Sequence, residues 1–376
     1  MRFQSYIKVS VSLIQNYEGK EPLALYLKSY FSKHKKHGSK DRKWISHFCY
    51  CYFRIGHALK NLSVEERLSA AILLCTKIGQ EVDDILEDAG VALAENLPSS
   101  FEIENIFPWS ADLSDGIDHV SFCRSFLCQP DLFIRLRPGY EATTKQKLSA
   151  ASIPFREISS HCLALNNATK VDTLLKLNKE VVIQDYNSQR VGGFFRVQKL
   201  SGDRLPRIWD CCCASGGKSI LAYDILPDFD LTVSDIRKSI LHNLKKRFNE
   251  AGIRNYTSFT ADLRLPQIQR SFDLIIADLP CSGSGTWSRT PEGLYFFDID
   301  QIGHYAALQK SIISNLVPHL KKGGRLVYMT CSVFKKENED IVRFIEEEFN
   351  LKKEREEILG GWDIRADTMF IAAFQL

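Results

Sequence analysis

The sequence carries almost no net charge and has no long apolar run. Its 376 residues include 49 Lys+Arg against 46 Asp+Glu, a formal net charge of +3. A protein that coats nucleic acid indiscriminately would be far more basic, so any phosphate-binding surface must be local. The best apolar run, residues 68–75, is halted by Lys77, and we expect neither a secretory signal nor a membrane span. With 44% hydrophobic residues, the composition excludes disorder and predicts two or three globular domains.

Regularly spaced cysteines are also missing. The 11 cysteines are odd in number and scattered, and no two form a Cys-x-x-Cys pair. This pattern excludes a disulfide framework and favours a reducing cytoplasm. Cys211, Cys212 and Cys213 are consecutive, and neighbours on an extended strand face opposite sides, so they cannot all reach one metal ion. We expect no metal.

The periodicity of apolar residues divides the chain into parts. Steps of three and four residues predict helices over 23–31, 40–62, 68–78 and 85–97. A stretch with few periodic apolar residues, 98–119, reads as a connector. We therefore predict a helical, possibly RNA-binding domain over 1–120, a small α/β intermediate unit over 121–200, and a third domain over 201–376.

The third domain alternates strand-like and helical segments. Strands are expected over 207–212, 231–234, 256–260, 272–277 and 325–330. The acidic stretch 337–357 reads as a helix. Alternating strands and helices indicate a Rossmann-like α/β fold with a mostly parallel sheet, whose ligand sits where strands end and helices begin.

The turn after the first of these strands runs from Asp210 to Ser219. Gly216 and Gly217 within it allow a ligand to approach the backbone closely. A phosphate-binding P-loop would need glycine where Cys212 stands, and the Gly-x-Gly-x-x-Gly dinucleotide fingerprint is absent. Nucleoside triphosphates, nicotinamide and flavin are therefore disfavoured as ligands.

Acidic residues follow the next strands. Asp235 is placed to accept hydrogen bonds from the two hydroxyls of a ribose, and Asp262 could reach an adenine amino group. Ribose and adenine without phosphates point to S-adenosylmethionine. The same aspartates would also suit ordinary strand-end turns.

Two cysteines, Cys281 and Cys331, follow the fourth and fifth strands. A lone cysteine there is more often a small buried hydrophobe, but a pair beside a methyl-donor site suggests pyrimidine chemistry. A thiolate that adds to carbon 6 activates carbon 5 for methylation, and a second polar group assists the final elimination. Asp278 suits the N3/N4 edge of cytosine.

These motifs resemble those of the RNA (cytosine-5) methyltransferases of the Sun/Nop class. Residues 210–219 are similar to the family's Asp-x-Cys-Ala-Ala-Pro-Gly-Gly-Lys-Thr, 278–285 to Asp-Ala-Pro-Cys-Ser-Gly-x-Gly, and 330–332 with 337–339 to Thr-Cys-Ser and Glu-Asn-Glu. The resemblance extends from about Gln184 to the end of the chain. It implies that Cys331 is the nucleophile, that Cys281 assists release, and that Lys218 lies near the reaction centre. DNA cytosine-5 methyltransferases instead use the Pro-Cys cysteine as nucleophile, so residue types alone leave both assignments open.

The resemblance also implies a set of cofactor contacts. The predicted cofactor-binding residues are Cys213, Ala214, Ser215, Gly216, Gly217, Lys218, Asp235, Arg237, Asp262, Asp278 and Pro280. Some positions depart from the family pattern. Ser215 replaces its proline and Cys213 its first alanine, Asp367-Thr-Met-Phe stands for Asp-Gly-Phe-Phe, and Arg137 stands where the family often has asparagine.

A local basic segment lies in the helical domain. Residues 33–43 hold six Lys/Arg against one Asp, followed by Trp44 and Tyr50. The segment could contact phosphates while the aromatic rings stack on bases, or it could be a solvated connection whose aromatics point into the bundle. The region resembles an antiterminator-type RNA-binding domain. Predicted RNA contacts are Lys35, Lys36, Lys40, Arg42, Arg135, Arg137 and Arg289.

The combined expectation is a monomeric, cytoplasmic enzyme that uses S-adenosylmethionine to methylate carbon 5 of cytosine in RNA. Small-subunit rRNA is the favoured substrate because of the helical N-terminal domain, and tRNA is the alternative. A ribosome assembly factor with an inactive methyltransferase fold also stays open, because Ser215 and the altered 367–370 segment depart from the family pattern.

Overall fold

The computed structural model describes residues 2–79, 101–197, 204–265 and 269–376. The helix predicted over 85–97 lies outside these ranges. The chain forms two compact units. The first comprises residues 1–113, 117–130 and 286–299, and the second comprises 114–116, 131–285 and 300–376. Of the helices in the described ranges, none is both long enough and apolar enough to cross a membrane.

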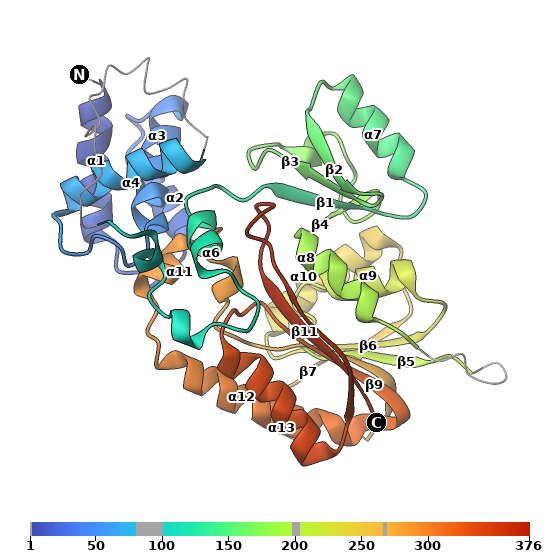
Figure 1. Cartoon of the computed structure of the whole chain (residues 1–376). Helices are drawn as coiled ribbons and strands as arrows, with labels where there is room; N and C mark the ends of the chain where they lie inside the picture. The colour runs from blue at the N-terminus through green and yellow to red at the C-terminus, as the bar shows by residue number, and fades with distance from the viewer. Residues whose placement is uncertain (1, 80–100, 198–203, 266–268) are drawn as a thin grey trace. The chain divides into compact units, whose positions relative to one another are not determined.

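The first unit is helical, as the sequence predicts (Figure 1). Its helices are α1 (Arg2–Asn16), α2 (Leu23–Lys33), α3 (Ser39–Arg54), α4 (Val64–Gly79), α6 (His119–Ser125) and α11 (Pro291–Phe296), with short 3-10 turns η1 (Ile103–Ile106) and η2 (Ser110–Asp112). Ile45, Phe48 and Tyr52 recur along one face of α3 and are buried. Burial of such a stripe against neighbouring helices stabilises the bundle.

The second unit begins with a small antiparallel sheet of order β2-β3-β1-β4. Its strands are β1 (Leu132–Leu136), β2 (Phe155–Ser159), β3 (Cys162–Leu165) and β4 (Val181–Ile183), accompanied by α7 (Glu141–Ala150) and α8 (Tyr186–Arg190). Ile134, Leu148 and Leu163 belong to its buried core. This part matches the predicted small α/β unit in its mixture of elements.

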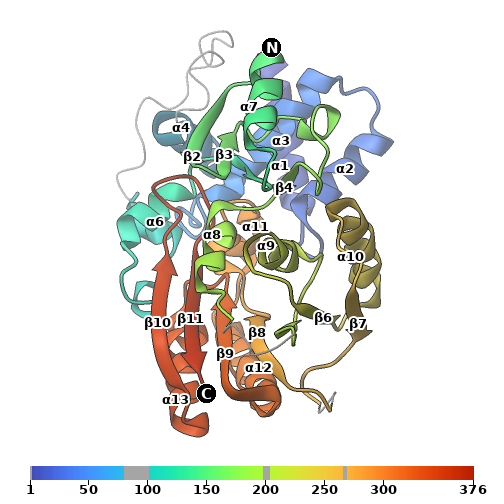
Figure 2. The ribbon, with the colours of Figure 1, turned by 90° about the vertical axis from the view of Figure 1, so that its right-hand side faces the viewer.

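The large sheet of the second unit has 7 strands in the order β10-β11-β9-β8-β5-β6-β7 (Figure 2). Five of them are parallel: β5 (Arg207–Asp210), β6 (Asp230–Asp235), β7 (Tyr256–Thr260), β8 (Phe272–Asp278) and β9 (Leu320–Thr330). All five strands predicted from the sequence are present. The prediction of a Rossmann-like, mostly parallel sheet is therefore confirmed.

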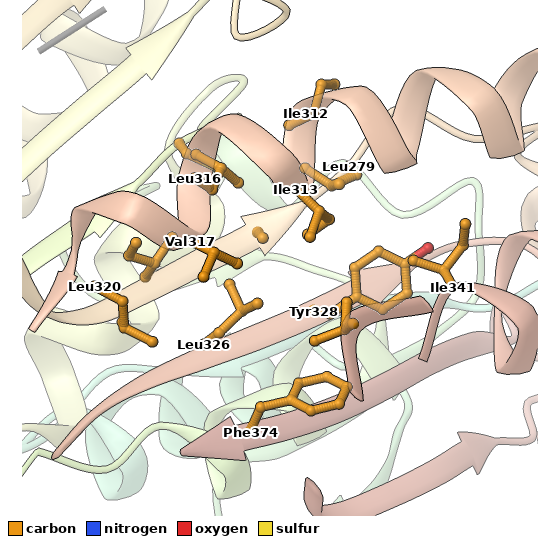
Figure 3. Packing of buried hydrophobic residues seen from close by; sticks show 14 of the residues in the cluster. Leu279, Ile312, Ile313, Leu316, Val317, Leu320, Leu326, Tyr328, Ile341 and Phe374 are labelled. Carbon is orange, nitrogen blue, oxygen red and sulfur yellow. The ribbon is translucent and has the colours of Figure 1, made fainter. Parts of the chain in front are cut away.

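Helices cover both faces of this sheet because its strands are apolar on both sides. One face packs against α9 (Gly217–Ile225) and α10 (Lys238–Ala251). The other packs against α12 (Gln301–Leu316) and α13 (Glu339–Phe349). Figure 3 shows this second core, in which Ile313, Leu316 and Tyr328 lie between the α12 helix and the sheet.

The far edge of the sheet corrects one sequence interpretation. The acidic stretch 337–357 was expected to be helical, but α13 ends at Phe349 and Asn350 adopts a left-handed φ of 51°. The chain then forms β10 (Lys352–Leu359), which pairs antiparallel with β11 (Met369–Gln375). Residues 352–355 are exposed, so their charges sit on an edge strand, where charged side chains are favoured and give no helical period.

Candidate active site

Two reduced cysteines meet at one edge of the large sheet. Cys281 follows β8 and Cys331 follows β9, and Asp278 pairs with Met329 at the carboxyl ends of these neighbouring parallel strands. The two Sγ atoms lie 3.3 Å apart, and both side chains are partly exposed. Loop contacts hold this spacing, since the Gly285 N–H donates to the carbonyl of Cys331 at 2.8 Å. The sequence predicts that both cysteines lie at this edge, and the structure brings their sulfur atoms into contact.

A buried cation lies beside the pair. Lys218, in the first turn of α9, donates from Nζ to Oδ2 of Asp278 at 2.6 Å. Burial alone would lower the pKa of Lys218, but the negative charge of Asp278 outweighs it, with further contributions from Cys331 and Asp210, and raises the pKa above its ordinary value. Lys218 is thus a fixed positive charge within electrostatic range of the Cys331 sulfur.

The pKa of the Cys281 thiol is raised by its surroundings. Close contact with Cys331, burial and the negative charge of Glu337 keep the pKa of Cys281 well above its usual range. Tyr305 and Tyr328 also face Cys281. The carboxylate of Glu337 thus acts on Cys281, and the ammonium of Lys218 interacts with Cys331.

The turn between β5 and α9 needs glycine at one position. Gly216 has a φ of +83°, and an added Cβ would lie 2.5 Å from Cε1 of Phe248. Only glycine adopts this left-handed conformation without strain, and here it also has no room for a side chain. Ser215 stands where the resembling family has proline, and its Oγ accepts a hydrogen bond from Nη1 of Arg247 at 2.6 Å. This contact supplies rigidity that a proline ring would otherwise give.

A cavity of about 620 Å³ lies beside this turn and reaches both cysteines. Its lining includes six of the predicted cofactor residues: Ala214, Asp235, Arg237, Asp262, Asp278 and Pro280. Five other predicted residues are not in the lining: Cys213, Ser215, Gly216, Gly217 and Lys218. Cys213 is buried against α10, and Cys212 faces the cavity instead. Cys211 and Cys212 lie in the turn that follows β5 and both line the cavity, which the sequence pattern did not resolve.

The two aspartates predicted to hold a nucleoside both carry an arginine partner. Oδ1 of Asp235 accepts from the backbone N–H and Nε of Arg237 at 2.9 and 3.0 Å, and Oδ2 accepts from the Ala214 N–H at 3.1 Å. Asp262 is bound in the same way by Arg264, at 2.9 Å from Nε. Both arginine side chains are more than half exposed, so a ligand diol or amine can displace them.

These pairs keep both carboxylates ionised. The pKa of Asp235 is lowered because hydrogen bonds from Arg237 outweigh the effect of burial. Hydrogen bonds from Arg264 lower the pKa of Asp262 to about 2. Beside them the cavity has an apolar wall that includes Ile236, Leu263 and Ile312. Hydrogen-bond acceptors next to an apolar slot suit a ribose with an attached adenine.

Asp210, at the end of β5, is fully buried rather than exposed to a ligand. Its Oδ2 accepts from Oγ of Ser219 at 2.6 Å, while Oδ1 has no hydrogen-bond partner among the described residues. Burial raises the pKa of Asp210 to about 7.

Sequence reasoning missed a buried polar network behind the cysteines. Glu337, in the 3-10 turn η7 (Lys335–Glu337), accepts from the Ser282 N–H at 2.8 Å and from Oγ of Ser332 at 2.5 Å. Gln309 of α12 donates from Nε2 to the carbonyl of Pro280 at 3.0 Å. Ser282 and Ser332 each follow a cysteine directly, so their position next to Cys281 and Cys331 was the available signal.

The predicted RNA contacts fall into different surroundings. Lys35, Lys36, Lys40 and Arg42 are exposed between α2 and the first turns of α3, whereas Trp44 is buried in the bundle. The basic side chains thus remain candidates for phosphate contact, and Trp44 does not serve as a stacking platform. Arg289 is partly buried in the first unit.

Arg135 and Arg137 are corrected by the structure. Both are buried, and both pair with Asp224, at 2.5 and 2.6 Å. Their alternation places them on one face of β1 as expected, but that face packs against α9 rather than solvent. Two buried arginines that pair with one carboxylate have a structural role, so Arg135 and Arg137 are not available to contact RNA.

No group of three or more His, Cys, Asp or Glu able to hold a metal ion occurs in the described ranges.

Comparison with known proteins finds a family match over the large sheet. Residues 197–368 match the family model described as 16S rRNA methyltransferase RsmB/F. The matched stretch is less than half of the 376 residues. The match agrees with the sequence prediction of a Sun/Nop-class methyltransferase that takes its methyl group from S-adenosylmethionine.

Curated relatives match this chain over part of their own length. The chain is 32% identical over 161 residues to the ribosomal RNA small subunit methyltransferase B of Proteus mirabilis, covering 42% of this chain and 37% of the relative. It is 29% identical over 234 residues to a probable ribosomal RNA small subunit methyltransferase B of Bacillus subtilis, covering 60% and 51%. The matched regions thus span about half of these relatives or less.

Solved structures share the fold over more of the chain. The crystal structure of PH0851 aligns with a TM-score of 0.73 and 19% identity over 99% of this chain and 98% of that one. NSun6 from Pyrococcus horikoshii aligns with a TM-score of 0.56 and 15% identity over 68% and 94%. At such low identity these neighbours show a shared fold and no more.

Proposed function

We propose that this protein methylates carbon 5 of a cytosine in RNA, with small-subunit rRNA as the substrate. The observation that carries the proposal is the contact of Cys281 and Cys331 at 3.3 Å on the wall of the cavity predicted to hold the cofactor. Simple methyl transfer to nitrogen or oxygen needs no thiol, whereas methylation at carbon 5 of a pyrimidine requires a nucleophile at carbon 6. The relatives named for small-subunit rRNA support the choice of RNA.

The proposed reaction begins at Cys331. Its thiolate, stabilised by the ammonium of Lys218, forms an S–C6 bond, and the C5=C6 electron pair becomes available at carbon 5. S-adenosylmethionine supplies the electrophilic methyl group that carbon 5 takes. Asp278, which borders both Lys218 and the cavity, is placed for the N3/N4 edge of the base.

Cys281 serves the second half of the reaction in this proposal. After methyl transfer, a base removes the proton from carbon 5, the electron pair reforms C5=C6, and the S–C6 bond breaks to release Cys331 as thiolate. Cys281 lies against Cys331 and holds its own proton. As the S–C6 bond breaks, the Cys281 thiol can donate its proton to the departing sulfur of Cys331, and Cys281 then regains a proton from solvent.

The residues that line the cavity fit the cofactor. Asp235 would accept from the ribose hydroxyls after displacing Arg237, Asp262 would accept from the adenine amino group, and Ile236 would pack against the ring. The exposed lysines 35, 36 and 40 would contact RNA phosphates from the helical unit.

A two-stage experiment tests the function. Calorimetry should detect binding of S-adenosylmethionine to the full chain, and tritiated methyl groups should then enter unmodified small-subunit rRNA as 5-methylcytosine. Methyl transfer to tRNA instead of rRNA would show that the substrate is tRNA, the alternative predicted from the sequence. Cofactor binding without transfer to any RNA would contradict the enzymatic proposal and favour an assembly factor.

A further inference from the structure

Glu337 lies buried between the two loops that carry the active-site cysteines. Its side chain is 0% exposed. Oε1 accepts from the N–H of Ser282, the residue after Cys281, at 2.8 Å. Oε2 accepts from Oγ of Ser332, the residue after Cys331, at 2.5 Å. One carboxylate therefore joins the two loops directly.

The neighbours of Glu337 tighten the same connection. Gln309 donates from Nε2 to the carbonyl of Pro280 and also, at 3.4 Å, to Oε1 of Glu337. Asn338 accepts from Oγ1 of Thr330 at 2.6 Å and donates to the carbonyl of Ser332 at 3.0 Å. The residues on both sides of each cysteine are thus tied to α12, to η7 or to Asn338 directly after η7, and these ties hold the two loops together.

The charge of Glu337 acts on the sulfur of Cys281. Glu337 is among the groups that hold the pKa of Cys281 high, whereas Lys218 interacts with Cys331. Burial raises the pKa of Glu337 itself, and hydrogen bonds from Ser282 and Ser332 oppose that effect. The other titratable groups facing Cys281 are Tyr305 and Tyr328, which are neutral at physiological pH.

We propose that Glu337 is a positioning residue that gives the two cysteines their different tasks, directing nucleophilic attack to Cys331 and reserving Cys281 for release. This inference rests on the proposed function for its biological meaning. The inference concerns the reactivity of two thiols near one carboxylate, and this reactivity can be measured without RNA or cofactor. Glu337 touches no reacting atom and acts through the loops and through its charge.

The test compares thiol reactivity in three variants of the full chain. Glu337→Gln keeps the shape and removes the charge. Glu337→Asp keeps the charge and loosens the loops. The matched control is Glu339→Gln, because Glu339 binds Ser114 and the Asp115 N–H rather than the cysteine loops. Iodoacetamide labelling from pH 6 to 9, read by peptide mass spectrometry, gives separate rates for Cys281 and Cys331.

The wild type should label Cys331 at least tenfold faster than Cys281. Glu337→Gln should raise the labelling rate of Cys281 about fivefold or more at pH 8, while Glu339→Gln should leave the ratio of the two rates unchanged. Glu337→Asp should keep the preference for Cys331 and still slow methyl transfer about tenfold. An unchanged ratio in Glu337→Gln, or an equal change in Glu339→Gln, would overturn the inference.

The two proposals fail in distinguishable ways. A wild-type protein that transfers methyl groups to no RNA would contradict the proposed function, yet its labelling ratio would still report on Glu337. If Glu337→Gln lowers the melting temperature too far for labelling, Ser332→Ala removes one anchor of the carboxylate and keeps the charge. That variant should slow methyl transfer with Cys281 remaining the slower thiol, and a loss of the preference would count against the role of the charge.

Discussion

The Nζ of Lys218 and the Oδ2 of Asp278 lie 2.6 Å apart, joining the first turn of α9 to the end of β8. Their side chains are 15% and 25% exposed. The pair connects the turn that borders the cavity of about 620 Å³ to the strand that leads to Cys281. A change at either residue should therefore affect both stability and chemistry.

Removing one member of the pair should cost more than removing both. Asp278→Asn leaves the buried ammonium of Lys218 without its counter-charge, and we expect the free energy of unfolding to fall by about 3 kcal/mol. The double variant Lys218→Met/Asp278→Asn should recover part of this loss and remain inactive. Chemical denaturation combined with methyl-transfer assays gives both readouts. Additive effects of the two single changes would contradict a coupled pair.

The two cysteines should differ when each is replaced. Cys281→Ala should accumulate a covalent protein–RNA adduct, because the S–C6 bond forms at Cys331 and is not released. Cys331→Ala should form no adduct and should lose activity by at least 1000-fold, on the order expected when a nucleophile is deleted. Denaturing gel electrophoresis with labelled RNA detects the adduct. The reverse pattern would exchange the two roles.

Asp210 should make stability depend on pH. Its pKa of about 7 in the folded state lies above the value near 4 of an unfolded aspartate, so the folded form is favoured at low pH and loses this advantage as pH rises through 7. The total change is up to about 4 kcal/mol. Asp210→Asn should reduce the difference in unfolding free energy between pH 5 and pH 8. The control Asp363→Asn, at an exposed site, should leave that difference as it is in the wild type.

Gly216 and Gly217 offer a matched pair of substitutions. Gly216→Ala forces a left-handed φ on alanine and places its Cβ against Phe248, which should destabilise the protein by about 1–3 kcal/mol. Gly217→Ala meets no atom within 4 Å and should change stability by less than about 1 kcal/mol. Thermal unfolding compares the two. Equal losses would show that the turn tolerates no side chain at either position.

The basic segment should account for much of the salt dependence of RNA binding. Replacing Lys35, Lys36 and Lys40 with Glu should weaken binding and flatten the plot of log affinity against log salt, by roughly 0.7 per lost single-strand phosphate contact. A triple control replaces other exposed lysines, Lys170, Lys322 and Lys352, and should leave the slope near that of the wild type. Equal effects of the two triple variants would place the RNA contact elsewhere.

The sequence predicted the five parallel strands and the location of both cysteines because buried parallel strands are continuous apolar runs and their ends meet at one edge. It did not predict β10, since Lys352 to Glu357 mix charges without a period. The roles of Arg135 and Arg137 were also misjudged. Alternation places two side chains on one face of a strand but gives no sign of the element that covers it, here α9 with Asp224.

For the candidate site, the sequence predicted the residues proposed to react better than the residues that hold them in place. Motif spacing identified Cys331 and Asp278, whereas Gln309 lies in a helix with no motif, and its hydrogen bond to Pro280 arises only from packing. The substitution of Cys212 for Cys213 in the cavity wall depends on where the strand ends and the turn begins, which the sequence pattern does not fix to one residue.

The place of β11 between β9 and β10 has a consequence for the order of folding. Phe370 pairs with Thr330, and the Thr368 N–H donates to the carbonyl of Gly285, whose own N–H holds Cys331. The strand that completes the surroundings of Cys331 is therefore made by the ribosome after every other element of the sheet. Until it inserts, the sheet has an open edge beside Cys331, so the surroundings of this thiol are completed late and through contacts of long sequence separation.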